Sequence, residues 1–156
     1  SGDGGFKDTD DYIFITGRVD DVINVAGHRL STAEMEEIVA SHRSVAECAV
    51  IGINDELKGQ IPLALVVAKS GEDIEHFQLQ HEVVHLVREK IGAVASLRDV
   101  VIVQRLPKTR SGKILRKMMR SIADGEQFQV PSTIDDEAII DEIRDVLEHA
   151  KIGCFK

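Results

Sequence analysis

The sequence has no tryptophan, one tyrosine and only two cysteines. Cys48 and Cys154 are too few for a disulfide framework, so we expect a reducing compartment, either the cytoplasm or, in a eukaryote, the mitochondrial matrix. Long hydrophobic runs are also missing. The longest, residues 61–68, contains Pro62 and is far too short to cross a bilayer, so we expect no membrane partner. The first residues do not resemble a signal peptide, and their Gly-rich start without Met suggests a piece of a longer chain.

The residues that are present are ordinary for a globular domain, except in their charge. At 156 residues, 43% hydrophobic and 29% charged, the chain can bury a real core. Its net charge is -8, yet residues 105–120 contain seven basic residues and no acidic one. An acidic protein with one concentrated basic segment is better suited to a local anion, such as a phosphate, than to broad contact with nucleic acid.

Hydrophobic periodicity predicts an α+β fold, with a small, mainly antiparallel sheet flanked by helices. Ser31 and Glu34 have the spacing of a capping box, so a helix should begin there and run to about residue 42. In a second helix, residues 76–91, we expect Phe77, Val84, Val87 and Ile91 to face inward. The remaining predicted strands are 12–16, 22–26, 45–52, 63–69 and 99–105, and the remaining helices are 114–123 and 136–150.

The basic segment contains the first motif that could carry chemistry, PKTRSGK at residues 107–113. Pro107 opposes regular structure, and Gly112 permits close backbone approach. Lys113 should lie where this loop meets a helix start, a position that favours anions. The motif is not a Walker A loop, because Pro107 and Ile114 stand where that loop needs Gly and Ser or Thr. A solvated basic loop remains the alternative.

A second motif, GRVDDVINVAGHR, occupies residues 17–29. Arg18 and Arg29 flank a short strand, and arginine suits bidentate contact with phosphate or carboxylate. Asp20 and the residue after it could form a turn or hinge. A purely structural hairpin is the alternative reading of the same residues.

The segment HEVVH at residues 81–85 matches the zinc-peptidase pattern H-E-x-x-H on a predicted helix. Such a site needs a third ligand, and no Glu or His follows at the usual extended spacing. We therefore interpret His81 and His85 as surface helix residues and predict no zinc chemistry.

Together, in this order, the two motifs resemble those of the acyl-adenylate-forming enzymes, in the acetyl-CoA and propionyl-CoA synthetase branch. Residues 17–31 resemble the hinge motif of that family, and residues 107–113 resemble its late lysine motif. Residues 1–3 resemble the end of a third motif, with Ser1 in place of the usual Thr. The resemblance covers nearly the whole chain. The sequences of residues 25–29 and 132–136 look more like the propionate members than the acetate members.

The resemblance implies a short-chain acyl-CoA synthetase that converts a carboxylate, ATP and CoA, with Mg²⁺, into acyl-CoA, AMP and pyrophosphate through acyl-AMP. It implies that residues 1–19 end a large N-terminal adenylation domain, that 20–125 form a mobile C-terminal domain, and that 126–156 form a connector and helix. The missing N-terminal domain would be the main partner, and this piece alone should be inactive in adenylation.

Carried over by position, the resemblance also implies site residues. Lys113 would bridge the acid and the α-phosphate during adenylation, Gly27 would keep the pantetheine channel open, and Asp20 would be the hinge. The other implied contacts are ATP at Asp3, Arg18 and Arg29, CoA at Ala26 and Arg88, and a metal site near Ala40, His42 and Val45.

One hypothesis of another class is an isolated binding module that holds RNA or an acidic partner on residues 105–120. It would need aromatic stacking groups beside the basic residues. Phe128 is the nearest aromatic residue, and the sole tyrosine, Tyr12, lies far along the chain, so the sequence favours the synthetase.

Overall fold

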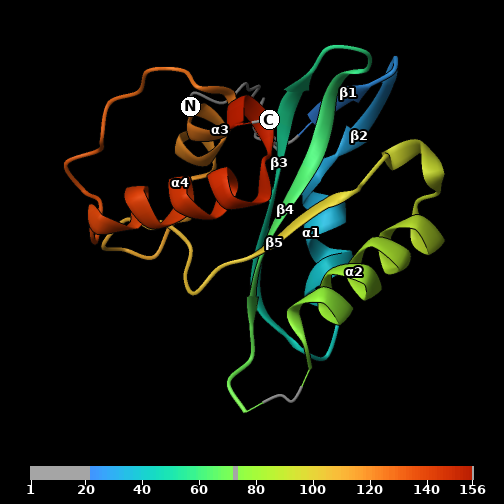
Figure 1. Cartoon of the computed structure of the whole chain (residues 1–156), viewed down its shortest axis with the longest axis horizontal. Coiled ribbons are helices and arrows are strands. Elements are labelled where there is room, and N and C mark those ends of the chain that lie inside the picture. Colours follow the sequence, from blue (N-terminus) through green and yellow to red (C-terminus); the bar gives the residue numbers. More distant parts are fainter. Residues whose placement is uncertain (1–21, 72–73, 156) are drawn as a thin grey trace, which may run out of the picture.

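The computed structural model describes residues 22–71 and 74–155. These residues form a five-stranded sheet with helices on both faces (Figure 1). The strands are β1 (Val22–Val25), β2 (His28–Ser31), β3 (Val45–Asp55), β4 (Gly59–Ala68) and β5 (Asp99–Ile102). The α-helices are α1 (Thr32–Ala40), α2 (His76–Lys90), α3 (Arg116–Asp124) and α4 (Ala138–Ala150), and two short 3₁₀ turns are η2 (Ala93–Ala95) and η3 (Gly153–Phe155). The predicted α+β class is confirmed.

The sheet is built around one long antiparallel hairpin. β3 and β4 pair from Val45 opposite Ala68 to Asp55 opposite Gly59. β1 and β2 form a second antiparallel hairpin, which joins β4 through the pair Val25 and Gly59. β5 adds the parallel pairing, alongside the second half of β4. Among the described strands, β3 pairs only with β4, so its other side is an edge of the sheet.

The central strands are buried on both faces, because successive side chains of a strand point in opposite directions. On β3, Ala49, Ile51 and Ile53 belong to one hydrophobic core, whereas Cys48 and Val50 belong to another. The first core is shared with α3 and α4, and the second with α1 and α2. Figure 1 shows these two pairs of helices on opposite sides of the sheet. The domain is thus three layers deep.

The capping box is confirmed, because the Ser31 hydroxyl accepts a hydrogen bond from the backbone N–H of Glu34 at 3.1 Å. The predicted inward face of α2 is partly wrong. Val87 is buried, but Phe77 is 78% exposed and stacks against the His81 ring. The stripe that packs on the sheet is Leu79, Val83 and Val87, at the four-residue spacing of one helix face, and Phe77 lies off it.

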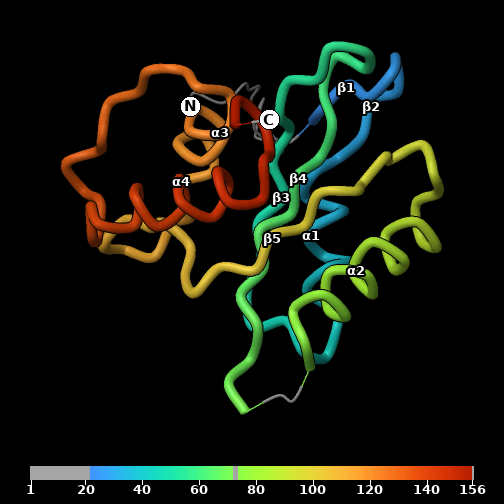
Figure 2. Tube along the Cα trace, in the orientation of Figure 1, coloured from blue at the N-terminus to red at the C-terminus, as the bar shows by residue number. Residues whose placement is uncertain are grey.

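Several boundaries differ from the sequence predictions. β3 continues to Asp55 rather than residue 52, and β5 ends at Ile102 rather than residue 105. α3 begins at Arg116 instead of residue 114, since Ile114 is still paired with Lys108 in an extended bridge. After α3, residues 126–135 connect to α4 without a helix or strand, and Figure 2 traces them in orange as a wide arc.

Candidate functional site

The Lys113 loop, residues 107–113, is a narrow turn closed by hydrogen bonds. The Thr109 N–H donates to the Lys113 carbonyl at 2.9 Å, and the Lys113 N–H donates to the Thr109 hydroxyl at 3.1 Å. The Leu115 N–H closes the base of the loop on the Pro107 carbonyl at 2.9 Å. Gly112 has a φ of 94°, which side chains rarely adopt, so glycine is needed there. The backbone of Lys113 is therefore fixed from both sides.

The end of the connector supports this loop from outside. Thr109 forms an isolated bridge with Ile134, and the Arg110 N–H donates to the Thr133 carbonyl at 2.9 Å. The Asp135 N–H returns a hydrogen bond to the Lys108 carbonyl at 2.9 Å. Since Ile134 is itself buried in the core shared with α3 and α4, the loop is anchored to that layer of the domain.

The side chain of Lys113 is available. It is exposed, and within residues 22–71 and 74–155 no hydrogen bond or ion pair involves its ammonium group. It borders an open cavity of about 590 Å³ whose wall also includes Leu115, Met118 and Phe128. A free cation on a fixed loop beside a partly apolar hollow can meet an anion supplied by another molecule or domain.

The basic segment is less free than its composition suggested. Arg105 forms ion pairs with Asp136 and Glu142, and Lys108 forms one with Glu47. Hydrogen bonds from Arg105 hold the pKa of the Glu142 carboxyl below its usual range. Arg116, a third member of the segment, is also paired. Three of the seven basic residues are thus paired within the domain, which weakens the hypothesis that residues 105–120 hold RNA or an acidic partner.

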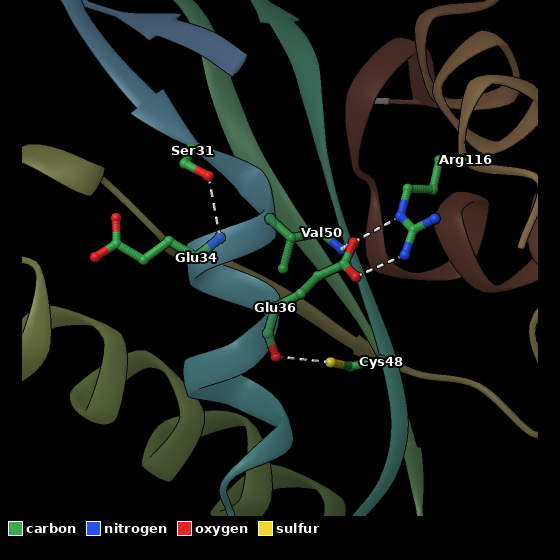
Figure 3. Close-up of polar contacts among 6 residues, drawn as sticks. All are labelled: Ser31, Glu34, Glu36, Cys48, Val50 and Arg116. Carbon is green, nitrogen blue, oxygen red and sulfur yellow. Dashed lines mark hydrogen bonds and ion pairs between the residues drawn. The ribbon is translucent and has the colours of Figure 1, made fainter. Parts of the chain in front are cut away.

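The partner of Arg116 is Glu36, on the opposite layer (Figure 3). The guanidinium of Arg116 donates two hydrogen bonds to the two carboxylate oxygens of Glu36, each at 2.7 Å. The same carboxylate accepts the Val50 N–H at the free edge of β3, at 3.0 Å. Further along that edge, the Asn54 N–H donates to the Asp124 carboxylate at 3.0 Å. The Glu36–Arg116 pair thus joins α1 to α3 around the outside of β3.

Sequence reasoning did not identify Glu36. It lies 80 residues from Arg116, and no local pattern connects two positions so far apart. Its backbone carbonyl also accepts a hydrogen bond from the Cys48 thiol, and burial, with the negative charge of Glu36 as a second cause, raises the pKa of that thiol to about 12. The thiol therefore stays neutral at physiological pH.

Ala26 and Gly27 form the two-residue turn between β1 and β2. Both have positive φ, 52° and 88°, as a tight hairpin turn requires. The Ala26 N–H donates to the Lys58 carbonyl at 2.8 Å, which docks the turn on the β3–β4 turn. Both residues are exposed, and a Cβ added to Gly27 would have no atom within 4 Å. Arg29 follows on β2 with an exposed side chain.

Arg88 is brought toward this turn through a chain of contacts. The Lys58 ammonium donates to the Ser96 hydroxyl at 2.8 Å, and Ser96 and Arg88 border the same small cleft. The turn at residues 26–27, the β3–β4 turn and the segment after α2 therefore meet at one end of the sheet. Within the described residues, Ala26 and Arg88, the positions predicted for CoA, are linked only through Lys58 and Ser96, and Lys113 lies on the layer that contains α3 and α4.

The predicted metal site lies at the end of α1. Both ring nitrogens of His42 are already engaged: Nε2 with the Glu82 carboxylate at 2.7 Å, and Nδ1 with the Ser44 N–H at 3.0 Å. The His42 ring cannot therefore serve as a ligand. Of the three predicted positions, Ala40 ends α1 and Val45 begins β3, and the His42 carbonyl accepts a hydrogen bond from the Val45 N–H at 3.1 Å.

In the HEVVH segment, the Glu82 carboxylate is engaged by neighbouring side chains. Glu82 bonds to His42 and Gln78, and the bond from His42 is the main cause that lowers the pKa of its carboxyl. Across the described residues, no group of three or more His, Cys, Asp or Glu side chains could hold a metal ion. In the same ranges, no helix is long and apolar enough to span a membrane. The predicted sites Asp3, Arg18 and Asp20 lie outside the described residues.

The chain is similar in sequence to several known proteins. The chain is 61% identical to an uncharacterized protein of Pseudomonas aeruginosa, over 98% of this chain and 24% of that protein. It is 48% identical to the mitochondrial acyl-CoA synthetase short-chain family member B of Dictyostelium discoideum, over 97% of this chain and 22% of the relative. It is 46% identical to the propionate–CoA ligase of Escherichia coli, over 94% and 24%.

Two solved structures are also similar to this chain. An acyl-CoA synthetase of Brucella canis matches with a TM-score of 0.61 and 35% identity, over 67% of this chain and 19% of that one. The amide bond synthetase McbA of Marinactinospora thermotolerans matches with a TM-score of 0.59 and 28% identity, over 68% and 21%. The chain thus spans about a quarter or less of its relatives. The family model of the AMP-binding enzyme C-terminal domain matches residues 34–113, and the chain belongs to that family.

Proposed function

We propose that the chain is the mobile C-terminal domain, residues 20–125 with a connector and helix at 126–156, of a short-chain acyl-CoA synthetase. The carrying observation is Lys113, an exposed cation without a partner in the described residues, on a loop fixed by its own hydrogen bonds. The names of the relatives support the reaction: each of three relatives from Dictyostelium, mouse and Escherichia coli is named as an acyl-CoA synthetase or CoA ligase.

In the first half-reaction, a carboxylate oxygen attacks the α-phosphorus of ATP, an acyl–phosphate bond forms, and pyrophosphate leaves. Negative charge increases on the oxygens around the reacting phosphorus. The Lys113 ammonium, placed between the acid and the α-phosphate, would stabilise that charge. Arg29 would contact the nucleotide phosphate, with Asp3 and Arg18 at the ribose and neighbouring oxygens. The ATP and acid pockets themselves would belong to the N-terminal domain.

In the second half-reaction, the CoA thiolate attacks the acyl carbonyl carbon, the bond to phosphate breaks, and AMP leaves. The turn at Ala26 and Gly27 would line the pantetheine channel, which its lack of side-chain bulk keeps open. Arg88 would contact a CoA phosphate from the nearby cleft. A rotation about Asp20 would exchange the two loops between the half-reactions.

Mg²⁺ would accompany ATP and offset its phosphate charge. A cation held by this domain would rest on the carbonyl oxygens near Ala40, His42 and Val45, because the His42 ring is engaged elsewhere. For the compartment we retain the predicted cytoplasm or mitochondrial matrix, since relatives include proteins named mitochondrial and bacterial proteins.

The identity of the acid substrate can be tested on the full-length protein. We propose propionate over acetate, supported by similarity to the Escherichia coli propionate–CoA ligase. The measurement is kcat/KM of the full-length enzyme for acids of two to four carbons. A clear preference for acetate would reject propionate while leaving the reaction class intact. No acyl-CoA from any of these acids would reject the synthetase.

A second test separates the domain from the whole protein. This chain alone should release no pyrophosphate from ATP and acid, because the nucleotide and acid pockets would be missing. The full-length protein is the positive control. Pyrophosphate release by the isolated chain at a comparable rate would show that the site is complete within these residues.

A further inference from the structure

Arg116 lies where the Lys113 loop leads into α3. It is the first residue of α3, and the preceding residue, Leu115, closes the loop on the Pro107 carbonyl. Arg116 and Lys113 also border the same 590 Å³ cavity. Any movement of Arg116 would therefore be passed to the loop that presents Lys113. No side chain caps the N-terminus of α3, so the start of this helix is not held by a capping hydrogen bond.

Glu36 holds Arg116 in one orientation. The two parallel hydrogen bonds fix the plane of the guanidinium, which a single contact would not do. The exposed fractions of the two side chains are only 20% for Arg116 and 16% for Glu36, so water competes weakly. The third contact of the carboxylate, with the Val50 N–H, fixes Glu36 to the sheet. Figure 3 shows this junction of α1, β3 and α3.

We propose that Glu36 and Arg116 are positioning residues for Lys113, which set the location of its ammonium group for the adenylation step. The inference rests on the proposed function. Neither side chain needs to touch a substrate. They would act by joining the end of the Lys113 loop to α1, across the edge of β3. A misplacement of about 1 Å in a reacting group can cost on the order of 10²-fold in rate.

Two substitutions remove the pair with little change in shape. Glu36→Gln keeps an acceptor oxygen for the Val50 N–H but loses the charge. Arg116→Lys keeps the charge but loses the two-pronged geometry. In the full-length enzyme, each should lower kcat for pyrophosphate release by about 10-fold to 10²-fold, with KM for ATP changed less. Thioester formation from supplied acyl-AMP should change much less.

Glu142→Gln is the matched control. Arg105 also makes two hydrogen bonds to Glu142, at 3.1 and 2.6 Å, but it keeps Asp136 as a second carboxylate. The same chemical change there should leave adenylation within about threefold of the wild type, by comparison with other exposed ion pairs.

A double-mutant cycle with Lys113→Ala separates positioning from general support of the fold. If Glu36 acts through Lys113, Glu36→Gln should have almost no further effect once the lysine is absent, because interacting residues are not additive. A purely structural role would cost the same factor in both backgrounds and would slow both half-reactions together. Equal costs in the two backgrounds would overturn the proposal.

The result also distinguishes this inference from the proposed function. If the wild type makes acyl-AMP and Lys113→Ala impairs it, but Glu36→Gln and Arg116→Lys do not, the positioning role is wrong and the synthetase stands. If the wild type makes no acyl-AMP from any short-chain acid, the proposed function fails first. We expect both variants to lose adenylation selectively when Lys113 is present. In the Lys113→Ala background, the same substitutions should have almost no further effect.

Discussion

The Lys113 loop and the Ala26–Gly27 turn would serve the same active site, but the molecule holds them by different means. The Lys113 loop is fixed by a network of hydrogen bonds to residues distant in the chain, and Arg116 beyond it is ion-paired. The turn depends on its own backbone, with two positive φ angles and a single backbone hydrogen bond to Lys58. A loop that must place a charge needs many restraints, whereas a turn that must leave space needs only its shape.

The sharpest test of this difference is Lys113→Ala in the full-length enzyme. Loss of the cation should reduce acyl-adenylate formation on the order of 10² to 10³-fold, by analogy with removal of one oxyanion-hole donor. Thioester formation from supplied acyl-AMP should be much less affected, because another loop would serve that step. Pyrophosphate release and thioester yield, measured separately, check this. Equal loss in both steps would contradict a division of labour between the loops.

Gly27→Leu should give the opposite pattern. The added side chain meets open space at present, so bulk would harm only a ligand that passes there, and the positive φ adds strain. We expect thioester formation to fall on the order of 10²-fold, with pyrophosphate release nearly intact. Ala26→Gly is the control, since it keeps the turn and adds no bulk. Loss of pyrophosphate release in Gly27→Leu would show that the turn supports the fold instead.

How far the sequence alone could lead also differs between the two loops. The turn is local, so the strand before it and its end at Gly27 could be predicted from neighbouring residues, although β2 after it was not predicted. The Lys113 motif could be located as well, but its supports could not. Glu36, Glu47 and Glu142 lie far away in the sequence, and only the fold shows that they pair with the basic segment. The sequence also predicts Phe77 to face inward, because periodicity indicates an apolar stripe but not which side of the helix meets the sheet.

A substitution on β3, away from the Ala26–Gly27 turn, should disturb the hairpin that carries the turn. A Cβ at Gly52 on β3 would overlap the buried side chain of Ile23 on β1. Because Ile23 is branched and enclosed, Gly52→Ala should destabilise the domain by about 1–3 kcal/mol, the usual cost of overpacking. Thermal unfolding of the chain measures this. Val22→Ala on the exposed side of β1 is the control and should stay within about 0.5 kcal/mol of the wild type. An unchanged melting temperature in Gly52→Ala would mean that the hairpin adapts freely.

The smallest expected effect is on the pH dependence of stability. It should arise from the ion pairs of Arg105 more than from the Ala26–Gly27 turn. Bonds with Arg105 lower the pKa of Glu142, and the Ala138 N–H and Arg105 lower that of Asp136. A lowered folded-state pKa means that this stability is present above the ordinary carboxyl pKa and is lost as the pH falls through the folded value. The melting temperature of Glu142→Gln should lie slightly below that of the wild type at pH 7, and the gap should close as the pH falls below the ordinary carboxyl range. A gap that stays constant over this range would exclude the ion pair as its cause.

The side-chain contacts along the free edge of β3 have a consequence for solubility. An unpaired strand edge is a template on which another chain can add a strand, and proteins that expose one tend to aggregate. Here the Glu36 carboxylate accepts the Val50 N–H and the Asp124 carboxylate accepts the Asn54 N–H. An incoming strand would have to displace both carboxylates and meet no free donor at those two residues. The contact that joins the two layers thus also protects the sheet from growing into a neighbouring molecule.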